Sequence, residues 1–143
     1  DAASDEKGVR ITTLDALWSE AEPATGPGRR VGLVKIDVEG AESAVLRCCL
    51  GTISEQLPLL YIEICPSSLV RFGSSIDEIE RLLDGLGYEF FRNIGERNST
   101  NDTFRIARLM SLAEGGPFFD LLAVHPTNKK YSAITKALVD NSG

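Results

Sequence analysis

The chain contains 143 residues, of which 43% are hydrophobic, so it can bury one core and a single domain is expected. Its net charge of −6 is spread along the sequence, and its only adjacent basic pairs, Arg29-Arg30 and Lys129-Lys130, are too short for a surface that binds nucleic acid. No apolar run approaches the roughly 20 residues that span a bilayer, and the N-terminus lacks the layout of a signal peptide, so neither a nucleic acid nor a membrane is expected as a partner.

The cysteines favour a reduced, cytoplasmic setting. There are three of them, an odd number. Cys48 and Cys49 are neighbours on a predicted helix, where their side chains diverge and cannot easily form a disulfide. Together with Cys65 they also lack a C-x-x-C spacing, so we expect no metal at the cysteines.

The first thirty residues predict a lead, a short strand and a helix. Residues 1–8 are polar and acidic and are expected to be flexible, whereas residues 9–12 suit a short strand. Thr12, with Asp15 three positions later, forms a capping arrangement that predicts the start of a helix. Residues 22–30 contain two prolines and two glycines, which predict a surface connection.

In the segment from residue 31 to residue 50 the spacing of apolar residues changes from that of a strand to that of a helix, and charged residues lie where the spacing changes. Up to residue 39 the side chains alternate, which predicts a strand. Its two faces are Leu33, Lys35, Asp37 and Glu39 on one side, and Val34, Ile36 and Val38 on the other. After Gly40 the apolar residues recur at helical spacing. Because ligands of open α/β sheets bind outside the carboxyl ends of the strands, Asp37 and Glu39 mark a candidate site.

A second strand follows residues 51–58, to which no element is assigned. It covers residues 59–65 and stops at Pro66. Strand, helix and strand in this order fit a right-handed βαβ unit, which makes the two strands parallel. Glu63 then lies near the carboxyl end of its strand, at the same edge as Asp37.

The remaining elements alternate between helix and strand. Ser75 and Glu78 form a second capping box, which predicts a helix that Gly87 ends. Residues 88–94 and 118–124 predict strands, residues 95–103 a polar loop, and residues 131–139 a terminal helix. Residues 104–113 are expected to form a helix, because Ile106, Leu109, Met110 and Ala113 fall on one side. The expected organisation is an α/β domain over residues 9–126 and a C-terminal tail over residues 127–143.

Three stretches resemble a known family: KIDVEGAE at residues 35–42, ITTLDALW at residues 11–18 and LLYIEI at residues 59–64. They resemble the C-terminal half of the FkbM family of S-adenosylmethionine-dependent methyltransferases. The resemblance implies an α/β, partial Rossmann-like fold with a mostly parallel sheet that contains a reversed strand, and S-adenosyl-L-methionine as cofactor. It also implies that the glycine-rich cofactor loop and the N-terminal strands lie upstream of Asp1. The strand at Leu33 would normally pair with the first of those strands, and without it would expose an apolar edge.

Methyl transfer to a hydroxyl requires alignment of oxygen, methyl and sulfur, and removal of the hydroxyl proton. Asp37 is the first candidate for a catalytic residue, as a hydrogen-bond acceptor either for the substrate hydroxyl or for the cofactor near its reactive end. Glu39 is the second candidate and could share that role. Lys35 and Glu63 are candidates for substrate binding, and the cofactor-binding residues are expected upstream. The expected reaction is O-methylation of a small or sugar-like hydroxyl compound by the full-length protein, with this chain inactive by itself.

The same residues also have structural interpretations. Lys35 and Asp37 can form an ion pair. Negative charge on Glu39 and Glu42 at the start of a helix is favourable by about 0.3 to 1 kcal/mol, whatever the function. Gly40 can serve only to make a tight turn. We favour the structural interpretation for Lys35, Glu42 and Glu63.

Two other classes of function stay open. The absent cofactor loop would suit a non-catalytic α/β interaction module. A phosphate-binding α/β domain would use Gly40 and the following helix as an anion site, although Glu39 and Glu42 place negative charge there. Asp37, Glu39 and Glu63 offer oxygen ligands suited to Mg²⁺ or Ca²⁺, but no histidine accompanies them and no metal is expected.

Overall fold

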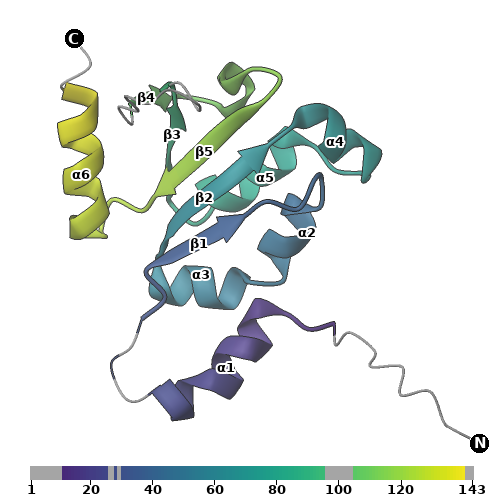
Figure 1. The fold of residues 1–143 in the computed structure, drawn as a ribbon, viewed down its shortest axis with the longest axis vertical. Helices are drawn as coiled ribbons and strands as arrows, with labels where there is room; N and C mark the ends of the chain where they lie inside the picture. Colours follow the sequence, from purple (N-terminus) through teal and green to yellow (C-terminus); the bar gives the residue numbers. More distant parts are fainter. Residues whose placement is uncertain (1–10, 26–27, 29, 96–104, 141–143) are drawn as a thin grey trace, which may run out of the picture.

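The computed structural model describes residues 11–25, 28, 30–95 and 105–140 (Figure 1). Within these residues the strands are β1 (Leu33–Ile36), β2 (Leu59–Ile64), β3 (Glu89–Asn93), β4 (Ile106–Leu109) and β5 (Phe119–Val124). The helices are α1 (Leu14–Thr25), α2 (Glu42–Arg47), α3 (Leu50–Gln56), α4 (Pro66–Arg71), α5 (Ile76–Asp84), the 3₁₀ helix η1 (Leu112–Gly115) and α6 (Lys129–Asp140). None of the described helices is long and apolar enough to cross a membrane.

The strands form one sheet in the order β1-β2-β5-β3-β4, and its directions correct one prediction. β1 and β2 are parallel, as predicted, with Ile36 opposite Ile62. The other three pairings are antiparallel, so the prediction of a mostly parallel sheet is wrong. The reason is that β5 runs in reverse between β2 and β3, and that β4 folds back on β3. β5 is therefore the reversed strand that the family resemblance implies.

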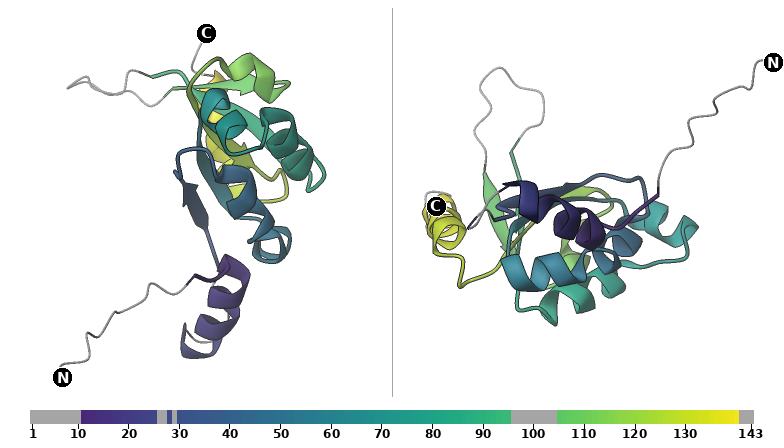
Figure 2. Two further views of the ribbon diagram at one scale, coloured as in Figure 1. Left: turned by 90° about the vertical axis from the view of Figure 1, so that its right-hand side faces the viewer. Right: turned by 90° about the horizontal axis from the view of Figure 1, so that it is seen from below.

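The main core lies between one face of the sheet and the helices α2 to α5 (Figures 1 and 2). Alternate residues of each strand face it, which is the period expected of a strand. Fully buried members of this core are Ile36, Leu60, Ile62 and Leu121 from the sheet, with Leu46, Ile53, Leu69, Ile79 and Leu83 from the helices. A smaller cluster on the opposite face contains Phe91, Ile106, Leu122 and Val124, against which Tyr131 of α6 packs. β5 is buried at every position because both faces and both edges of this strand are covered.

β1 is one of the two edge strands of the described sheet, and β4 is the other (Figure 1). Leu33, on the face away from α2 and α3, is 54% exposed, and Val38 just beyond the strand is 37% exposed. Native proteins seldom leave apolar side chains beside an unpaired strand edge, because such an edge can pair with another chain. This geometry is the exposed apolar edge that the family resemblance implies.

The predicted helix over residues 104–113 is wrong, because β4 and η1 occupy this segment. Ile106 is opposite Asn93 and Leu109 is opposite Phe90, which places the two buried side chains on opposite faces of the sheet. Ile106 and Leu109 are three residues apart because the strand is buried on both faces. In the sequence this spacing looks the same as the apolar face of a helix. Met110, which the helix would have buried, is 79% exposed.

Residues 51–58, for which the sequence predicts no element, contain most of α3, which begins at Leu50. The first backbone N–H groups of α3 are bound by a distant carboxylate, that of Asp15 in α1. Asp15 accepts hydrogen bonds from the backbone N–H of Gly51 at 3.0 Å, the backbone N–H of Thr52 at 2.7 Å and the Thr52 hydroxyl at 2.6 Å. Asp15 thus caps α3 from another helix, and no local motif marks this start.

Thr13 caps α1 in place of the predicted Thr12. Its hydroxyl accepts the N–H of Ala16 at 3.1 Å, and α1 begins at Leu14. The predicted cap at Ser75 is confirmed, since its hydroxyl accepts the N–H of Glu78 at 3.2 Å. The helix α5 ends at Asp84, three residues before Gly87, and the predicted terminal helix is α6. The predictions for residues 1–8 and for the loop at 96–103 lie outside the described residues.

The hydrogen bonds to Asp15 make the contact between α1 and α3 sensitive to acid. Partial burial acts to raise the pKa of Asp15, but the hydrogen bonds from Thr52 and Gly51 outweigh burial, so this pKa lies below its ordinary value of 3.8. A carboxyl group with a depressed pKa in the folded state contributes stability above its ordinary pKa. That contribution is lost as the pH falls through the lower, folded value.

We therefore expect Asp15→Asn to lower the free energy of unfolding at pH 7 by about 1 to 2 kcal/mol, because the neutral amide cannot accept all three hydrogen bonds. The difference between the two proteins should shrink as the pH falls below 3.8. Urea unfolding at several pH values measures it. Asp84→Asn, at an exposed position at the end of α5, is the control. An equal loss in both variants would contradict a role for Asp15 as a cap.

Candidate functional site

The segment that follows β1 presents the carboxylates singled out in the sequence. Asp37 comes directly after Ile36, at the carboxyl end of the strand, and both Asp37 and Glu39 are exposed. The ammonium of Lys35 donates to Asp37 Oδ2 at 2.9 Å. The two side chains are 58% and 38% exposed, so this ion pair lies at the surface and leaves the Asp37 carboxylate accessible. The predicted ion pair is confirmed, and it does not bury Asp37.

The turn itself depends on Gly40. Glu39 has φ +56° and Gly40 has φ +118°, so the chain passes through two left-handed conformations in succession. A Cβ on Gly40 would lie 2.6 Å from the carbonyl oxygen of Ser68 and 2.6 Å from the ring of Phe72. The structural interpretation of Gly40 is supported, with one addition. The backbone that approaches it belongs to α4, which follows the second strand.

Glu42 fixes the turn from inside. Its side chain is 2% exposed, and its Oε1 accepts the N–H of Gly40 at 3.0 Å. Oε2 of the same carboxylate is buried and has no hydrogen-bond partner among the described residues. Because a carboxylate already occupies the N–H at the turn, the alternative of an anion site at Gly40 is disfavoured.

Carboxylates follow one another across three adjacent strands at this end of the sheet. The parallel register that places Ile36 opposite Ile62 brings Asp37 to the level of Glu63. Glu63 in turn is directly opposite Asp120 of β5. Neighbouring strands lie about 4.8 Å apart, so the three residues form a row roughly 10 Å long. We call Asp37, Glu63 and Asp120 the carboxylate row.

Asp120 is the member of this row that sequence reasoning missed. It is only 5% exposed, in a strand whose other residues are all apolar, FDLLAV. A buried carboxylate is expensive unless other groups compensate it, so an acid inside such a strand is itself a signal of a special position. Nothing local in the sequence shows that it faces Glu63, because β2 and β5 lie far apart along the chain.

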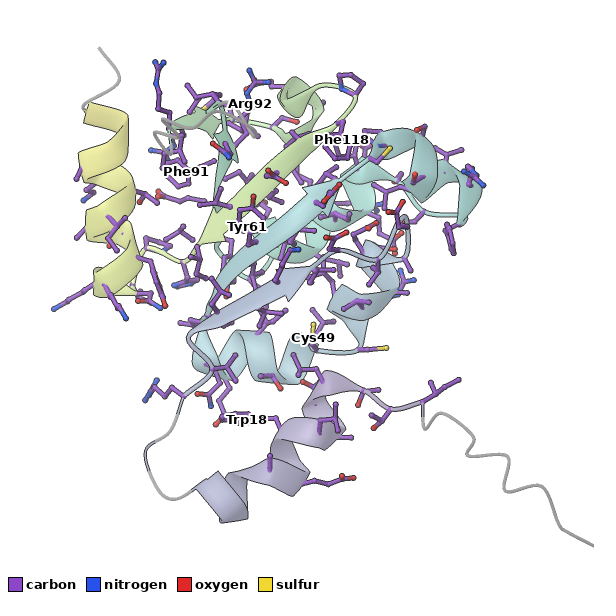
Figure 3. All side chains as sticks on the ribbon, in the orientation of Figure 1. Trp18, Cys49, Tyr61, Phe91, Arg92 and Phe118 are labelled. Carbon is purple, nitrogen blue, oxygen red and sulfur yellow. The ribbon has the colours of Figure 1, made fainter. Side chains whose placement is uncertain are left out.

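A cavity of about 300 Å³ opens beside Asp120, where β3 ends and β5 begins. Arg92 and Phe118, both labelled in Figure 3, line it at that end of the sheet. Phe118 is 49% exposed, and the Arg92 guanidinium donates to the carbonyl of Gly115 at 3.1 Å. The cavity therefore offers an aromatic surface and a carboxylate, which is a combination suited to a small polar organic molecule.

Cys65 lies just beyond β2 at the same edge of the sheet. Hydrogen bonds from the hydroxyl groups of Ser67 and Ser68 lower the pKa of its thiol, and the sulfur lies 3.3 Å from the Ser67 oxygen. In the part of the chain that the structure describes, no three His, Cys, Asp or Glu side chains are grouped so that they could hold a metal ion. The chemistry available at this edge is therefore that of carboxylates, hydroxyls and one thiol.

Comparison with known proteins gives one match. The family described as the methyltransferase FkbM domain matches residues 1–90, well over half of the chain, and this range includes β1, the Gly40 turn and β2. No curated protein and no solved structure matches the chain significantly. Asp120 and the cavity beside it lie outside the matched residues.

The contact at Gly40 generates a stability prediction with a matched control. Gly40→Ala and Gly73→Ala both place a Cβ at positive φ, but Gly73 has nothing within 4 Å of that position. Positive φ alone costs about 1 to 2 kcal/mol, and the clash with the Ser68 carbonyl adds a similar amount. We expect Gly40→Ala to lose at least about 1 kcal/mol more than Gly73→Ala in urea unfolding. Equal losses would show that α4 moves away freely.

Proposed function

Because the chain belongs to the FkbM methyltransferase domain family, we propose that it takes part in methyl transfer from S-adenosylmethionine to the oxygen of a small or sugar-like hydroxyl compound. The observation that carries this proposal is the position of Asp37, exposed at the carboxyl end of a strand that pairs in parallel with β2. We further propose that the glycine-rich cofactor loop lies upstream of Asp1, in the full-length protein.

The residues of the Gly40 turn fit such a cofactor. Asp37 and Glu39 offer exposed carboxylate oxygens beside the open edge of β1. Carboxylates can accept hydrogen bonds from an ammonium group or from ribose hydroxyls, and they attract a sulfonium cation. The bound cofactor would supply an electrophilic methyl group on that sulfonium. Glu39 is the residue that we assign to this contact, since it lies on the turn itself.

Asp37 has a different role in this proposal. Lys35 holds one carboxylate oxygen, Oδ2, and thereby fixes the orientation of the group. The second oxygen, Oδ1, would accept the proton that the acceptor hydroxyl gives up as its oxygen is methylated. A positioned base of this kind contributes about 10²- to 10⁴-fold to a rate. Lys35 is therefore a positioning residue.

The acceptor would extend from Asp37 along the carboxylate row toward the cavity at Asp120. Glu63 stands between the two ends, and its oxygens suit the hydroxyl groups of a sugar-like compound. The aromatic side chain of Phe118, at the mouth of the cavity, suits the apolar face of such a ring. These features support a polyhydroxylated acceptor over an extended apolar one.

We expect the full-length protein to bind S-adenosylhomocysteine, the cofactor product, in isothermal titration calorimetry. The 143-residue chain alone should bind it far more weakly, because most contacts to the adenosine are assigned upstream. Adenosine serves as the control ligand, since it lacks the amino acid portion that the Gly40 turn would face. Absence of S-adenosylhomocysteine binding to the full-length protein would favour an interaction module that keeps the fold without the reaction.

Substitutions at Asp37 and at Lys35 distinguish the chemical role of Asp37 from its role in the ion pair. Asp37→Asn in the full-length protein should lower turnover by about 10²- to 10⁴-fold while S-adenosylhomocysteine affinity changes little. Lys35→Gln breaks the same ion pair but keeps the carboxylate, so it should lower turnover much less. Equal losses of turnover in both variants would assign Asp37 to the ion pair alone.

A further inference from the structure

A second cavity lies at the opposite end of β1 from the Gly40 turn, where the strand begins. It has a volume of about 410 Å³ and forms where the start of α6 meets the segments that lead into β1 and β2 (Figure 1). Three cationic side chains line it, those of Arg30, Lys129 and Lys130. None of the described residues that line it is Asp or Glu, although the chain as a whole carries a net charge of −6. The cavity is therefore a concentrated positive region on an acidic protein.

The polar groups around this cavity are held in place. The Asn128 side-chain amide donates to the carbonyl of Leu57 at 2.9 Å, which ties the start of α6 to the segment before β2. The Thr127 hydroxyl lies 2.7 Å from His125 Nδ1. The ammonium of Lys130 lies 5.4 Å from the centre of the Tyr131 ring. Binding groups that are already ordered lose little entropy when a ligand arrives.

The lysines are placed where their charge is unfavourable without a ligand. Lys129 and Lys130 are the first two residues of α6, and a helix N-terminus carries partial positive charge that disfavours cations. The backbone N–H groups at the start of a helix have no partner within it. In α6 those of Tyr131 and Ser132 donate to the carbonyl of Asn128 at 3.1 and 3.0 Å, which leaves those of Lys129 and Lys130 for a ligand. Arg30 adds a third positive charge from the segment before β1. An anion in the cavity would compensate the charges of the two lysines and the arginine and would accept from the N–H groups of Lys129 and Lys130.

We propose that this cavity binds a phosphate monoester with a small organic group. Three cations and the N–H groups of Lys129 and Lys130 suit a compact dianion, whereas a nucleic-acid backbone needs a longer basic surface. The volume exceeds what a bare phosphate needs, and Val31, Leu57 and Tyr131 add apolar surface beside the cations. The organic group of the ester contacts these three side chains.

This site is independent of the proposed methyl transfer. The four residues of β1 separate the cavity, lined by Val31 and Gly32, from Asp37. At about 3.3 Å per residue the separation is roughly 13 Å or more, too far for one small molecule to contact Asp37 and both lysines. A phosphate ester bound here would not touch Asp37. It would either change methyl transfer indirectly, through the structure, or attach the protein to a phosphorylated molecule.

Isothermal titration of the full-length protein with phenyl phosphate tests the proposal. We expect binding that is tighter than that of inorganic phosphate, because the phenyl ring adds apolar contact, and no binding of phenol. The double variant Lys129→Gln, Lys130→Gln should weaken phenyl phosphate binding tenfold or more. Lys136→Gln, an exposed position on the same helix outside the cavity, is the matched control and should bind like the original protein.

Four outcomes would overturn the proposal. The first is no heat of binding at millimolar phenyl phosphate, and the second is equal weakening by the double variant and by Lys136→Gln. The third is loss of the binding signal when sodium chloride is added to the ionic strength of the phenyl phosphate solution. The fourth is binding to phosphatidic acid vesicles without binding of the soluble ester. Equal affinity for inorganic and phenyl phosphate would overturn the assignment of an organic group. Circular dichroism spectra of the double variant that match the original show that any loss reflects the charges and leaves the fold intact.

Discussion

The contact between Gly40 and the backbone of Ser68 sets the position of the turn that carries Asp37 and Glu39. The turn can lie against α4 only because residue 40 has no side chain, and it passes through positive φ at residues 39 and 40. Buried Glu42 then holds the turn from inside through the Gly40 N–H. A turn that is fixed from two sides can present Asp37 at a constant position, which a base in an aligned displacement reaction requires.

The pairing of the strands brings other carboxylates to the same end of the sheet as Asp37. Parallel pairing of β1 with β2 brings Asp37 level with Glu63, and the reversed β5 adds Asp120 beside it. The polar row is thus built from strands that are otherwise among the most apolar parts of the chain. The basic cavity uses the other ends of the same strands, so two regions of opposite charge are separated by the length of β1.

Sequence patterns predicted the elements whose signals are local. Alternation before Gly40, the Ser75 cap and the mostly apolar residues of β5, which only Asp120 interrupts, each correspond to an observed element. The failures share a cause, because the deciding partner lies far along the chain. α3 is capped by Asp15 from α1, and the two buried residues of β4 face opposite sides of a sheet that the segment alone does not reveal. Asp120 was missed for the same reason, since its meaning comes from Glu63.

The order of the strands has a consequence for synthesis. β5 is the last of the described strands along the sequence, yet it lies between β2 and β3 and is buried at every position. While a ribosome is still making the chain, β2 and β3 have no strand between them, and the main core lacks Leu121 and Ala123. The nascent chain therefore cannot close its sheet until Val124 has left the exit tunnel, and shortening the gene before that codon would leave two unpaired strand edges.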